Sequence, residues 1–235
     1  MGLQRLLALR SGGTGCTISG VVTPVGTYST FIGSQELKLP LVPIAEDLAI
    51  ALLITVDYGV SFSAKAGAEI AELLAPYDVD VVASVATMGI PLAIEVTRSL
   101  GLDDYLIFQK TPKIHLKDAI DEPVKSITTG AQQRLLFDRN RVGAVANRRV
   151  AVVDDVVSTG ASIQAALNLL RRVGAIPVAI GALVTESGAW KATLGDDAAL
   201  VHALGAIPIF RRDASGEFIA DWSGDAMPPG RVKAV

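Results

Sequence analysis

Two adjacent carboxylates stand beside a hydroxyl- and glycine-rich turn in the segment VAVVDDVVSTGAS, residues 150–162. A short apolar run precedes Asp154 and Asp155, and apolar residues at helical spacing follow Ser162. Backbone N–H groups at the start of a helix bind phosphate, while carboxylates accept hydrogen bonds from hydroxyl groups. The residue types and their order therefore predict a site that holds a sugar hydroxyl pair and a phosphate together.

The elements that must position this segment alternate along the chain. Strands are expected at residues 81–86, 105–108, 150–153, 178–184 and 207–210, helices at 63–74, 90–100 and 163–173, and a strand or helix end at 49–55. Such alternation predicts an α/β fold with a mostly parallel sheet and helices on both faces. Ligands bind beyond the carboxyl ends of strands in open parallel sheets, where Asp154 and Asp155 are expected.

Composition narrows the class of protein further. The 235 residues carry a formal net charge of −3, which gives no support to a nucleic-acid surface. The uncharged apolar run between Asp80 and Glu95 is interrupted by Gly89 and Pro91 and is too short for a membrane-spanning helix. Cys16 is the only cysteine, so no intramolecular disulfide can form, and a reducing, cytoplasmic compartment fits. No nucleic acid and no membrane is therefore expected as a partner.

Other kinds of site also carry an acid pair after an apolar strand. A Walker B pair requires the sequence G-x-x-x-x-G-K-[ST] upstream, and the chain contains none. A receiver domain would place its acids near the N-terminus, and Asp155 alone could serve as a helix-capping acid. The attached turn from Ser158 to Ser162 favours a binding function over these alternatives.

Residues 150–162 resemble the phosphoribosyl pyrophosphate (PRPP) signature of the type I phosphoribosyltransferases. That signature combines an apolar strand, two acids, a short turn, Thr-Gly and a small or hydroxyl residue. The resemblance implies that Asp154 and Asp155 hold the ribose O2 and O3, and that Val156 also lies against the base. The implied PRPP-binding turn continues through Val157, Ser158, Thr159, Gly160, Ala161 and Ser162, with the last five around the 5-phosphate.

Two other segments follow predicted strands and resemble parts of the same family. Thr87, Met88 and Gly89 occupy the place of the family's pyrophosphate loop, which often contains a non-proline cis peptide. Lys110 and Lys113 resemble a lysine pair of the adenine phosphoribosyltransferases, and Lys110 is implied as a catalytic group together with the two aspartates. The alternatives are a turn that needs glycine only for packing and two solvated surface lysines.

The resemblance covers roughly residues 41–210 and implies the type I phosphoribosyltransferase fold. This fold has a Rossmann-like core of about five parallel strands with flanking helices, a small hood and a flexible lid loop. The expected division is a hood or irregular extension over residues 1–40, a core over 41–212 and a C-terminal extension over 213–235. The lid falls within residues 117–141, where 133–137 can pair with 125–129 as a β-ribbon.

The implied reaction is displacement of pyrophosphate from C1 of PRPP by a ring nitrogen of a nucleobase, such as the purine adenine, in nucleotide salvage. Mg²⁺ is expected to arrive with the pyrophosphate, without a dedicated protein metal cage, and the family's habit implies a homodimer. Two features differ from the adenine pattern: residues 128–130 (TTG) lack a glutamate, and Met88 replaces an arginine. A non-catalytic PRPP-binding regulator and a transferase for another acceptor, such as orotate, remain as alternatives.

Overall fold

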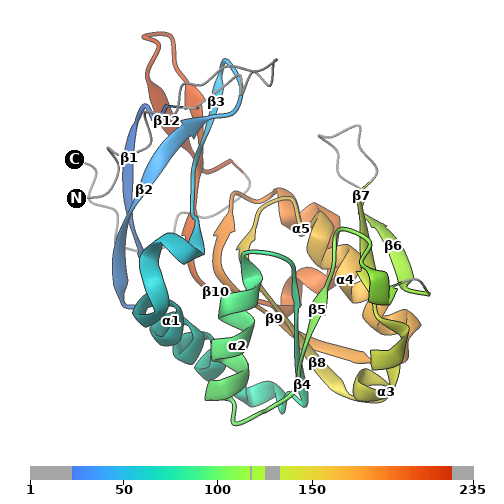
Figure 1. The fold of residues 1–235 in the computed structure, drawn as a ribbon. Coiled ribbons are helices and arrows are strands. Elements are labelled where there is room, and N and C mark those ends of the chain that lie inside the picture. The colour runs from blue at the N-terminus through green and yellow to red at the C-terminus, as the bar shows by residue number, and fades with distance from the viewer. Residues whose placement is uncertain (1–22, 117, 125–132, 224–235) are drawn as a thin grey trace, which may run out of the picture.

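A parallel sheet forms the centre of the molecule (Figure 1). The computed structural model describes residues 23–223 except residue 117 and residues 125–132. The five strands follow the order β10-β9-β8-β4-β5, and every neighbouring pair is parallel. Their bounds are β4 (Val81–Val85), β5 (Tyr105–Phe108), β8 (Arg149–Val157), β9 (Ile176–Glu186) and β10 (Val201–Ile207). The predicted α/β fold with a Rossmann-like core of about five parallel strands is confirmed.

Helices cover both faces of this sheet, as predicted. The helices α1 (Gly59–Leu74) and α2 (Gly89–Ser99) share one apolar core, and α3 (Val142–Val145), α4 (Ala161–Arg172) and α5 (Ala189–Leu194) share the other. Short 3₁₀ turns are η1 (Thr55–Tyr58), η2 (Ala75–Tyr77), η3 (Ile114–Leu116), η4 (Arg139–Arg141) and η5 (Gly195–Leu200). Within the described part of the chain, no helix is both long and apolar enough to cross a lipid bilayer.

The strand β8 separates the two cores, and its side chains alternate between them. Val150 and Val152 pack in the core of α4, whereas Ala151 and Val153 pack in the core of α1 and α2. All four residues are fully buried. A two-residue period directs successive side chains to opposite faces, so this short run is apolar throughout although it is a strand.

A second sheet of antiparallel strands forms the hood. Its order is β1-β2-β3-β11-β12, with β1 (Gly26–Ile32), β2 (Gln35–Pro43), β3 (Leu48–Ala51), β11 (Ile209–Arg212) and β12 (Phe218–Asp221). The hood sheet therefore takes in residues 41–51 and 209–212, which the sequence placed in the core. The reason is long-range pairing, since Ile50 lies opposite Ile209. The Gly33 N–H donates to the Leu204 carbonyl at 3.1 Å and joins the hood to β10.

A separate two-stranded ribbon lies beside α4. The antiparallel strands β6 (Ile120–Val124) and β7 (Gln133–Phe137) form it. The sequence predicted a ribbon in which residues 125–129 pair with β7. The structure instead pairs residues 120–124 with β7. Residues 125–132 lie outside the described residues. In β6 only Val124 is buried, so its sequence, IDEPV, lacks the apolar alternation that would have marked it as a strand.

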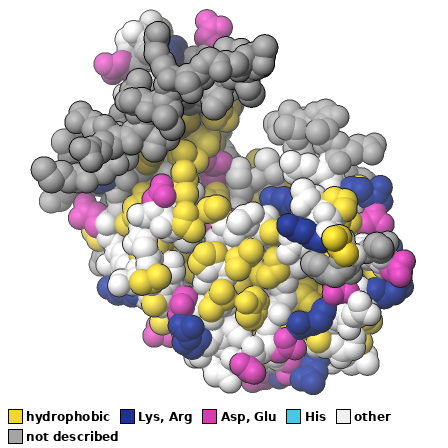
Figure 2. Space-filling model, viewed as in Figure 1, with side chains coloured by type: hydrophobic (Ala, Val, Ile, Leu, Met, Phe, Trp, Pro, Cys, Tyr) yellow, Lys and Arg dark blue, Asp and Glu magenta, His cyan; other side chains and the backbone are white. Residues whose placement is uncertain are grey.

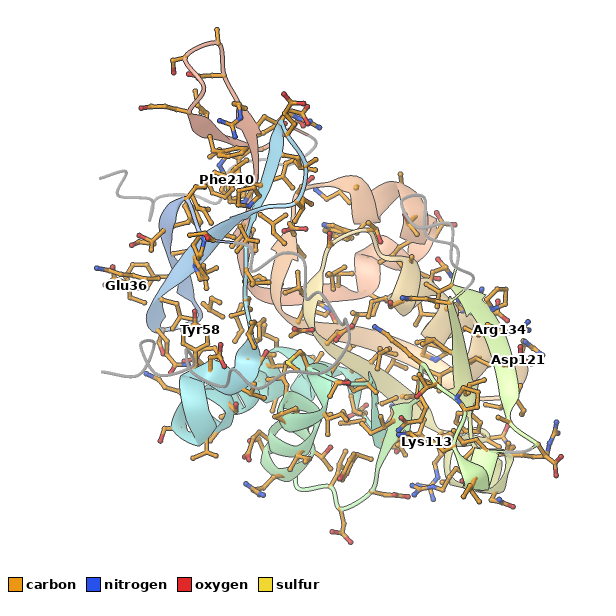
Figure 3. All side chains as sticks on the ribbon, turned by 45° about the horizontal axis from the view of Figure 1, so that its top comes forward. Glu36, Tyr58, Lys113, Asp121, Arg134 and Phe210 are labelled. Atoms are coloured by element: carbon orange, nitrogen blue, oxygen red, sulfur yellow. The ribbon has the colours of Figure 1, made fainter. Side chains whose placement is uncertain are left out.

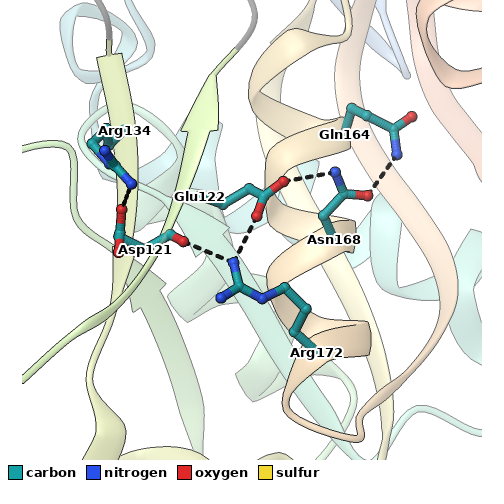
Figure 4. A network of polar contacts seen from close by, with 6 residues as sticks. All are labelled: Asp121, Glu122, Arg134, Gln164, Asn168 and Arg172. Carbon is teal, nitrogen blue, oxygen red and sulfur yellow. Dashed lines mark hydrogen bonds and ion pairs between the residues drawn. The ribbon is translucent and has the colours of Figure 1, made fainter.

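A polar network fixes this ribbon to α4 (Figure 4). The Glu122 carboxylate accepts from Asn168 Nδ2 at 3.0 Å and from Arg172 Nη1 at 2.8 Å. Arg172 Nη1 also donates to the Asp121 carbonyl at 2.8 Å, and Arg134 pairs with the Asp121 carboxylate. The base of the predicted lid is thus attached to α4, the helix that begins at the predicted phosphate turn.

Candidate functional site

The carboxyl ends of β4, β5 and β8 converge on one cavity of about 250 Å³. Asp154 and Asp155 line it together with residues from the ends of β4 and β5. The full lining is Val85, Ala86, Thr87, Met88, Lys110, Asp154, Asp155, Val156, Val157, Ser158, Thr159, Gly160, Ala161, Ser162 and Ile163. Three segments that lie far apart in the sequence therefore meet where the sequence placed a ligand.

The pairing of β8 explains why its acids reach this cavity. The register of β8 with β4 ends at the pair Ser84–Val153. Pairing with β9 continues beyond it, with Asp154 opposite Ala182. Both aspartates therefore lie within the end of β8, not after it, and extend past the last residue that β4 covers. Because β4 is shorter, a space remains beyond its end, and both residues border that space.

The turn between β8 and α4 has the geometry of an anion site. Gly160 has φ of 77°, a left-handed conformation that favours glycine, and it stands directly before α4. The Gly160 carbonyl accepts from the Gln164 N–H at 2.8 Å, which closes the first helical turn. N–H groups of a first turn have no partner within their helix, and the positive end of the helix dipole favours an anion there.

The predicted pyrophosphate turn lies close to Asp154. The Ala86–Thr87 peptide bond is cis, and α2 begins at Gly89. A Cβ at residue 89 would lie 2.3 Å from Ser84 Oγ and 2.9 Å from Asp154 Oδ1. Thr87 and Met88 line the cavity, whereas Gly89 lies behind them and lets α2 start close to the Asp154 carboxyl group.

The ionised form of Asp154 is unfavourable in the folded protein. Its residue borders the cavity, but protein atoms surround its carboxyl group, and this desolvation raises its pKa well above the usual range. The negative charge of Asp155 raises the pKa further, whereas the positive charge of Lys110 acts in the opposite direction. The Asp155 N–H donates to Asp154 Oδ1 at 3.0 Å. A ligand that donates hydrogen bonds to this carboxylate would offset the cost.

Replacing Asp154 with asparagine is therefore expected to stabilise the ligand-free protein. Because its pKa is raised, the Asp154 carboxyl group holds its proton more tightly in the folded protein than in the unfolded chain. Ionisation of Asp154 therefore lowers the stability of the folded protein as the pH rises above about 4. The melting temperature of Asp154→Asn should exceed that of the wild type at neutral pH, by roughly 2–4 °C for each kcal/mol removed. Thermal unfolding between pH 4 and 8 measures this. The exposed Asp103→Asn is the control, and a difference that shrinks with rising pH would contradict the assignment.

The two predicted lysines occupy different places. Lys110 lines the cavity, and it follows Gln109, whose N–H and carbonyl pair with Leu136 at 3.0 and 2.8 Å. Lys113 is exposed and is not among the lining residues; Figure 3 shows it on the segment after β5. A 3₁₀ turn begins directly after it, at Ile114. The structure thus brings one lysine of the pair to the two carboxylates.

The resemblance implies a pyrophosphate contact for Lys110, so Lys110→Ala, which removes an ammonium group able to form charge-assisted hydrogen bonds, is expected to weaken binding of pyrophosphate by roughly 10- to 100-fold. Lys113→Ala is the matched control and should change the affinity less than about threefold, a few tenths of a kcal/mol, as for an exposed charge. Isothermal titration with magnesium pyrophosphate measures both. Equal losses in the two variants would show that Lys113 reaches the ligand.

Two polar residues beside the cavity were not predicted. Ser84 is fully buried, and its hydroxyl has no partner among the described residues. Glu186 ends β9 and accepts a hydrogen bond from Ser158. A signal for Glu186 was present, because it is an acid that follows the apolar run 178–184 and so stands at a strand end like Asp154. Ser84 carries no comparable signal, since a single serine within an apolar strand is unremarkable.

A model of the phosphoribosyl transferase domain matches residues 63–201, which include the acid pair, both turns and Lys110. The chain belongs to the phosphoribosyltransferase family. An adenine phosphoribosyltransferase structure from Rhodothermus marinus aligns with a TM-score of 0.59 at 19% identity, over 72% of this chain and 94% of that one. At that identity the likeness shows the fold.

Curated relatives include both regulators and enzymes. Transcriptional regulator GfcR 1 of Methanosarcina barkeri is 34% identical over 112 residues, 48% of each chain. Orotate phosphoribosyltransferase of Thermotoga maritima is 29% identical over 122 residues, 52% of this chain and 54% of the relative. The matched part of the chain thus spans about half the length of these relatives.

Proposed function

We propose that the protein transfers the 5-phosphoribosyl group from PRPP to a nucleobase and releases pyrophosphate. The observation that carries this proposal is the meeting of an acid pair, a phosphate turn, a glycine turn and Lys110 around one cavity. PRPP carries a ribose diol, a 5-phosphate and a pyrophosphate, and the cavity presents one matching feature for each of them. A metabolite with only one phosphate would leave part of this arrangement unused.

The residues divide the work as follows in this proposal. Asp154 and Asp155 accept hydrogen bonds from the ribose O2 and O3 hydroxyls, and the turn from Ser158 to Ser162 holds the 5-phosphate. Thr87, Met88 and Gly89 form the pyrophosphate turn. Lys110 neutralises charge that develops on the leaving pyrophosphate, and Val156 packs against the incoming base. Fixed donors and a fixed cation act mainly by orientation and electrostatic stabilisation, because they need no rearrangement as charge separates.

The residues present fit a magnesium ion that enters with its ligand. The described residues contain no group of three His, Cys, Asp or Glu side chains placed to hold a metal, and the cavity offers two aspartates. Mg²⁺ commonly keeps several waters and binds one or two carboxylates plus phosphate oxygens. When bound, the ion would reduce the negative charge of the pyrophosphate and make it a better leaving group.

For the acceptor, we propose a purine such as adenine, in nucleotide salvage. Support comes from the resemblance of the Lys110 segment to the adenine enzymes and from the placement of Lys110 in the cavity. The lid residues 128–130, which differ from the adenine pattern, lie outside the described residues. Orotate is the alternative acceptor, favoured by the similarity to orotate phosphoribosyltransferase.

A second candidate function is regulation by a PRPP-binding protein without transfer activity. The specific observation in its favour is the 34% identity to a transcriptional regulator. The PRPP site serves both functions equally, because holding the donor does not require an acceptor. The two functions differ in whether a base completes the reaction.

Pyrophosphate release from magnesium PRPP, measured with adenine, hypoxanthine, guanine, xanthine, orotate and uracil in turn, tests the proposal. Turnover with a purine supports the transferase and names the acceptor, and turnover with orotate alone corrects the acceptor. Tight PRPP binding without turnover for any base would favour the regulator. Absence of PRPP binding would refute both functions.

We also propose that the chain acts in the cytoplasm as a homodimer. Figure 2 shows hydrophobic side chains gathered in the middle of the face viewed in Figure 1. Near the start of α1, Val56 and Val60 are 53% and 84% exposed. Clustered apolar surface is typical of association surfaces. Light scattering on the full chain tests the dimer, and a monomer at micromolar concentration would contradict it.

A further inference from the structure

A buried carboxyl group lies directly behind the phosphate turn. Glu186 is the last residue of β9 and is 8% exposed. Ser158 Oγ donates a hydrogen bond to its Oε2 at 2.5 Å. The register explains the contact, because Val157 of β8 lies opposite Thr185 of β9, which places Ser158 and Glu186 next to each other at the end of the pair.

An acid in this position opposes anion binding unless it serves another purpose. Burial of a carboxylate is costly, and the described interaction that offsets this cost for Glu186 is the hydrogen bond from Ser158. Burial raises the pKa of Glu186, and the hydrogen bond from Ser158 lowers it in part. The hydroxyl of Ser158 is therefore the group that solvates this carboxyl.

This contact changes what Ser158 can offer a phosphate. A serine hydroxyl has one hydrogen, and in Ser158 that hydrogen is committed to Glu186. The oxygen that remains can only accept, and a phosphate dianion has no hydrogen to give. Thr159 differs, because its Oγ1 accepts from the Ala161 N–H at 3.4 Å and no described group takes its hydrogen. Ser162 also lines the cavity, and its hydroxyl is likewise unused among the described residues.

The residues after Glu186 pack against the same turn. Trp190 Nε1 donates to the Ser187 carbonyl at 2.9 Å, which folds the chain back after β9. Gly160 packs so closely on this segment that a Cβ would lie 3.2 Å from the Trp190 carbonyl and 3.3 Å from Leu194 Cγ. The turn thus packs on residues 186–194, with Glu186 bonded to Ser158 and α5 against Gly160.

We propose that Glu186 is a positioning residue for the phosphate turn, one that holds the Ser158 hydroxyl and leaves Thr159 and Ser162 as the side-chain donors to the 5-phosphate. This inference rests on the proposed function, because it takes the turn as the 5-phosphate site. The sequence predicted that the Ser158 hydroxyl contacts the phosphate, whereas this inference assigns that hydroxyl to Glu186. The backbone of Ser158 stays at the site, while its side chain anchors the turn to β9.

Calorimetric titration of the full chain with ribose 5-phosphate, and separately with magnesium pyrophosphate, tests the assignment. Glu186→Ala and Ser158→Ala are each expected to weaken ribose 5-phosphate binding about 10-fold, and the double variant should be no worse than either, because both remove one contact. Glu186→Gln keeps an oxygen that accepts from Ser158 and should bind within about threefold of the wild type. Pyrophosphate affinity should change less than twofold throughout. The exposed Glu72→Ala is the matched control.

Three results would overturn the inference while the proposed function stands. They are unchanged ribose 5-phosphate binding in Glu186→Ala, equal weakening toward both ligands, and additive losses in the double variant. Thr159→Ala in the Glu186→Ala background should weaken binding further, since it removes a separate donor. Failure of the wild type to bind ribose 5-phosphate and PRPP would instead refute the proposed function, and this inference with it.

Discussion

Replacing Asp154 and Asp155 together with asparagine is expected to reduce the affinity for PRPP by at least about 100-fold. Each carboxylate accepts from a ribose hydroxyl in the proposed complex, and a hydrogen bond to a charged group contributes roughly 1.5–3 kcal/mol. Asparagine keeps the shape but replaces two charged acceptor oxygens with one neutral carbonyl oxygen and an amide NH₂ donor. Titration with magnesium PRPP measures the loss, and circular dichroism checks the fold.

The ligand used in the titration identifies the part of the site that is lost. Binding of inorganic pyrophosphate, which has no diol, should fall far less than binding of PRPP in the double variant. Asp103→Asn, an exposed carboxylate on the loop before β5, controls for the change in net charge. An unchanged PRPP affinity in the double variant would refute the assignment of these acids to the ribose.

Gly89→Ala is expected to impair two parts of the site at once. The added Cβ would lie 2.3 Å from Ser84 Oγ and 2.9 Å from Asp154 Oδ1, so the serine must rotate and the carboxylate must move away from α2. Overpacking of this kind costs about 1–3 kcal/mol. We expect a loss of transfer activity of at least about 10-fold, because a displaced carboxylate no longer meets the ribose, together with a lower melting temperature.

A matched glycine makes this result interpretable. Gly143 in α3 has no atom within 4 Å of its ideal Cβ position, so Gly143→Ala should leave activity unchanged and raise stability slightly. Activity assays and thermal unfolding on both variants compare the two glycines directly. Normal activity in Gly89→Ala would mean that the Asp154 carboxyl group has more freedom than its packing indicates.

The core could be predicted because its signals are local. The apolar run of β8, the two acids and the helical period of α4 occupy about two dozen consecutive residues, so strand, turn and helix could be identified together. Thr87 and Lys110 lie beside them because parallel strands end at the same edge of the sheet. Local pattern and sheet geometry suffice for this half of the molecule.

The hood and the outer parts of the site depend on contacts between residues far apart in the sequence, which a short segment of sequence cannot reveal. Pairing of Ile50 with Ile209 joins residues far apart in the chain, so the hood boundary could not be found from composition. Lys113 lies outside the cavity lining, directly before a 3₁₀ turn that the sequence pattern did not predict. Glu186 is a single acid at a strand end, and its link to the site is one hydrogen bond across two strands.

The alternation of β8 between two cores has a consequence for how this protein can change. An insertion or deletion of one residue between Val150 and Val153 would exchange the side chains of the two cores and also rotate the acid pair away from the cavity. The length of β8 is therefore constrained by the placement of Asp154 and Asp155 in the cavity. In the proposed function, the ribose contacts of Asp154 and Asp155 and the base contact of Val156 all depend on that length.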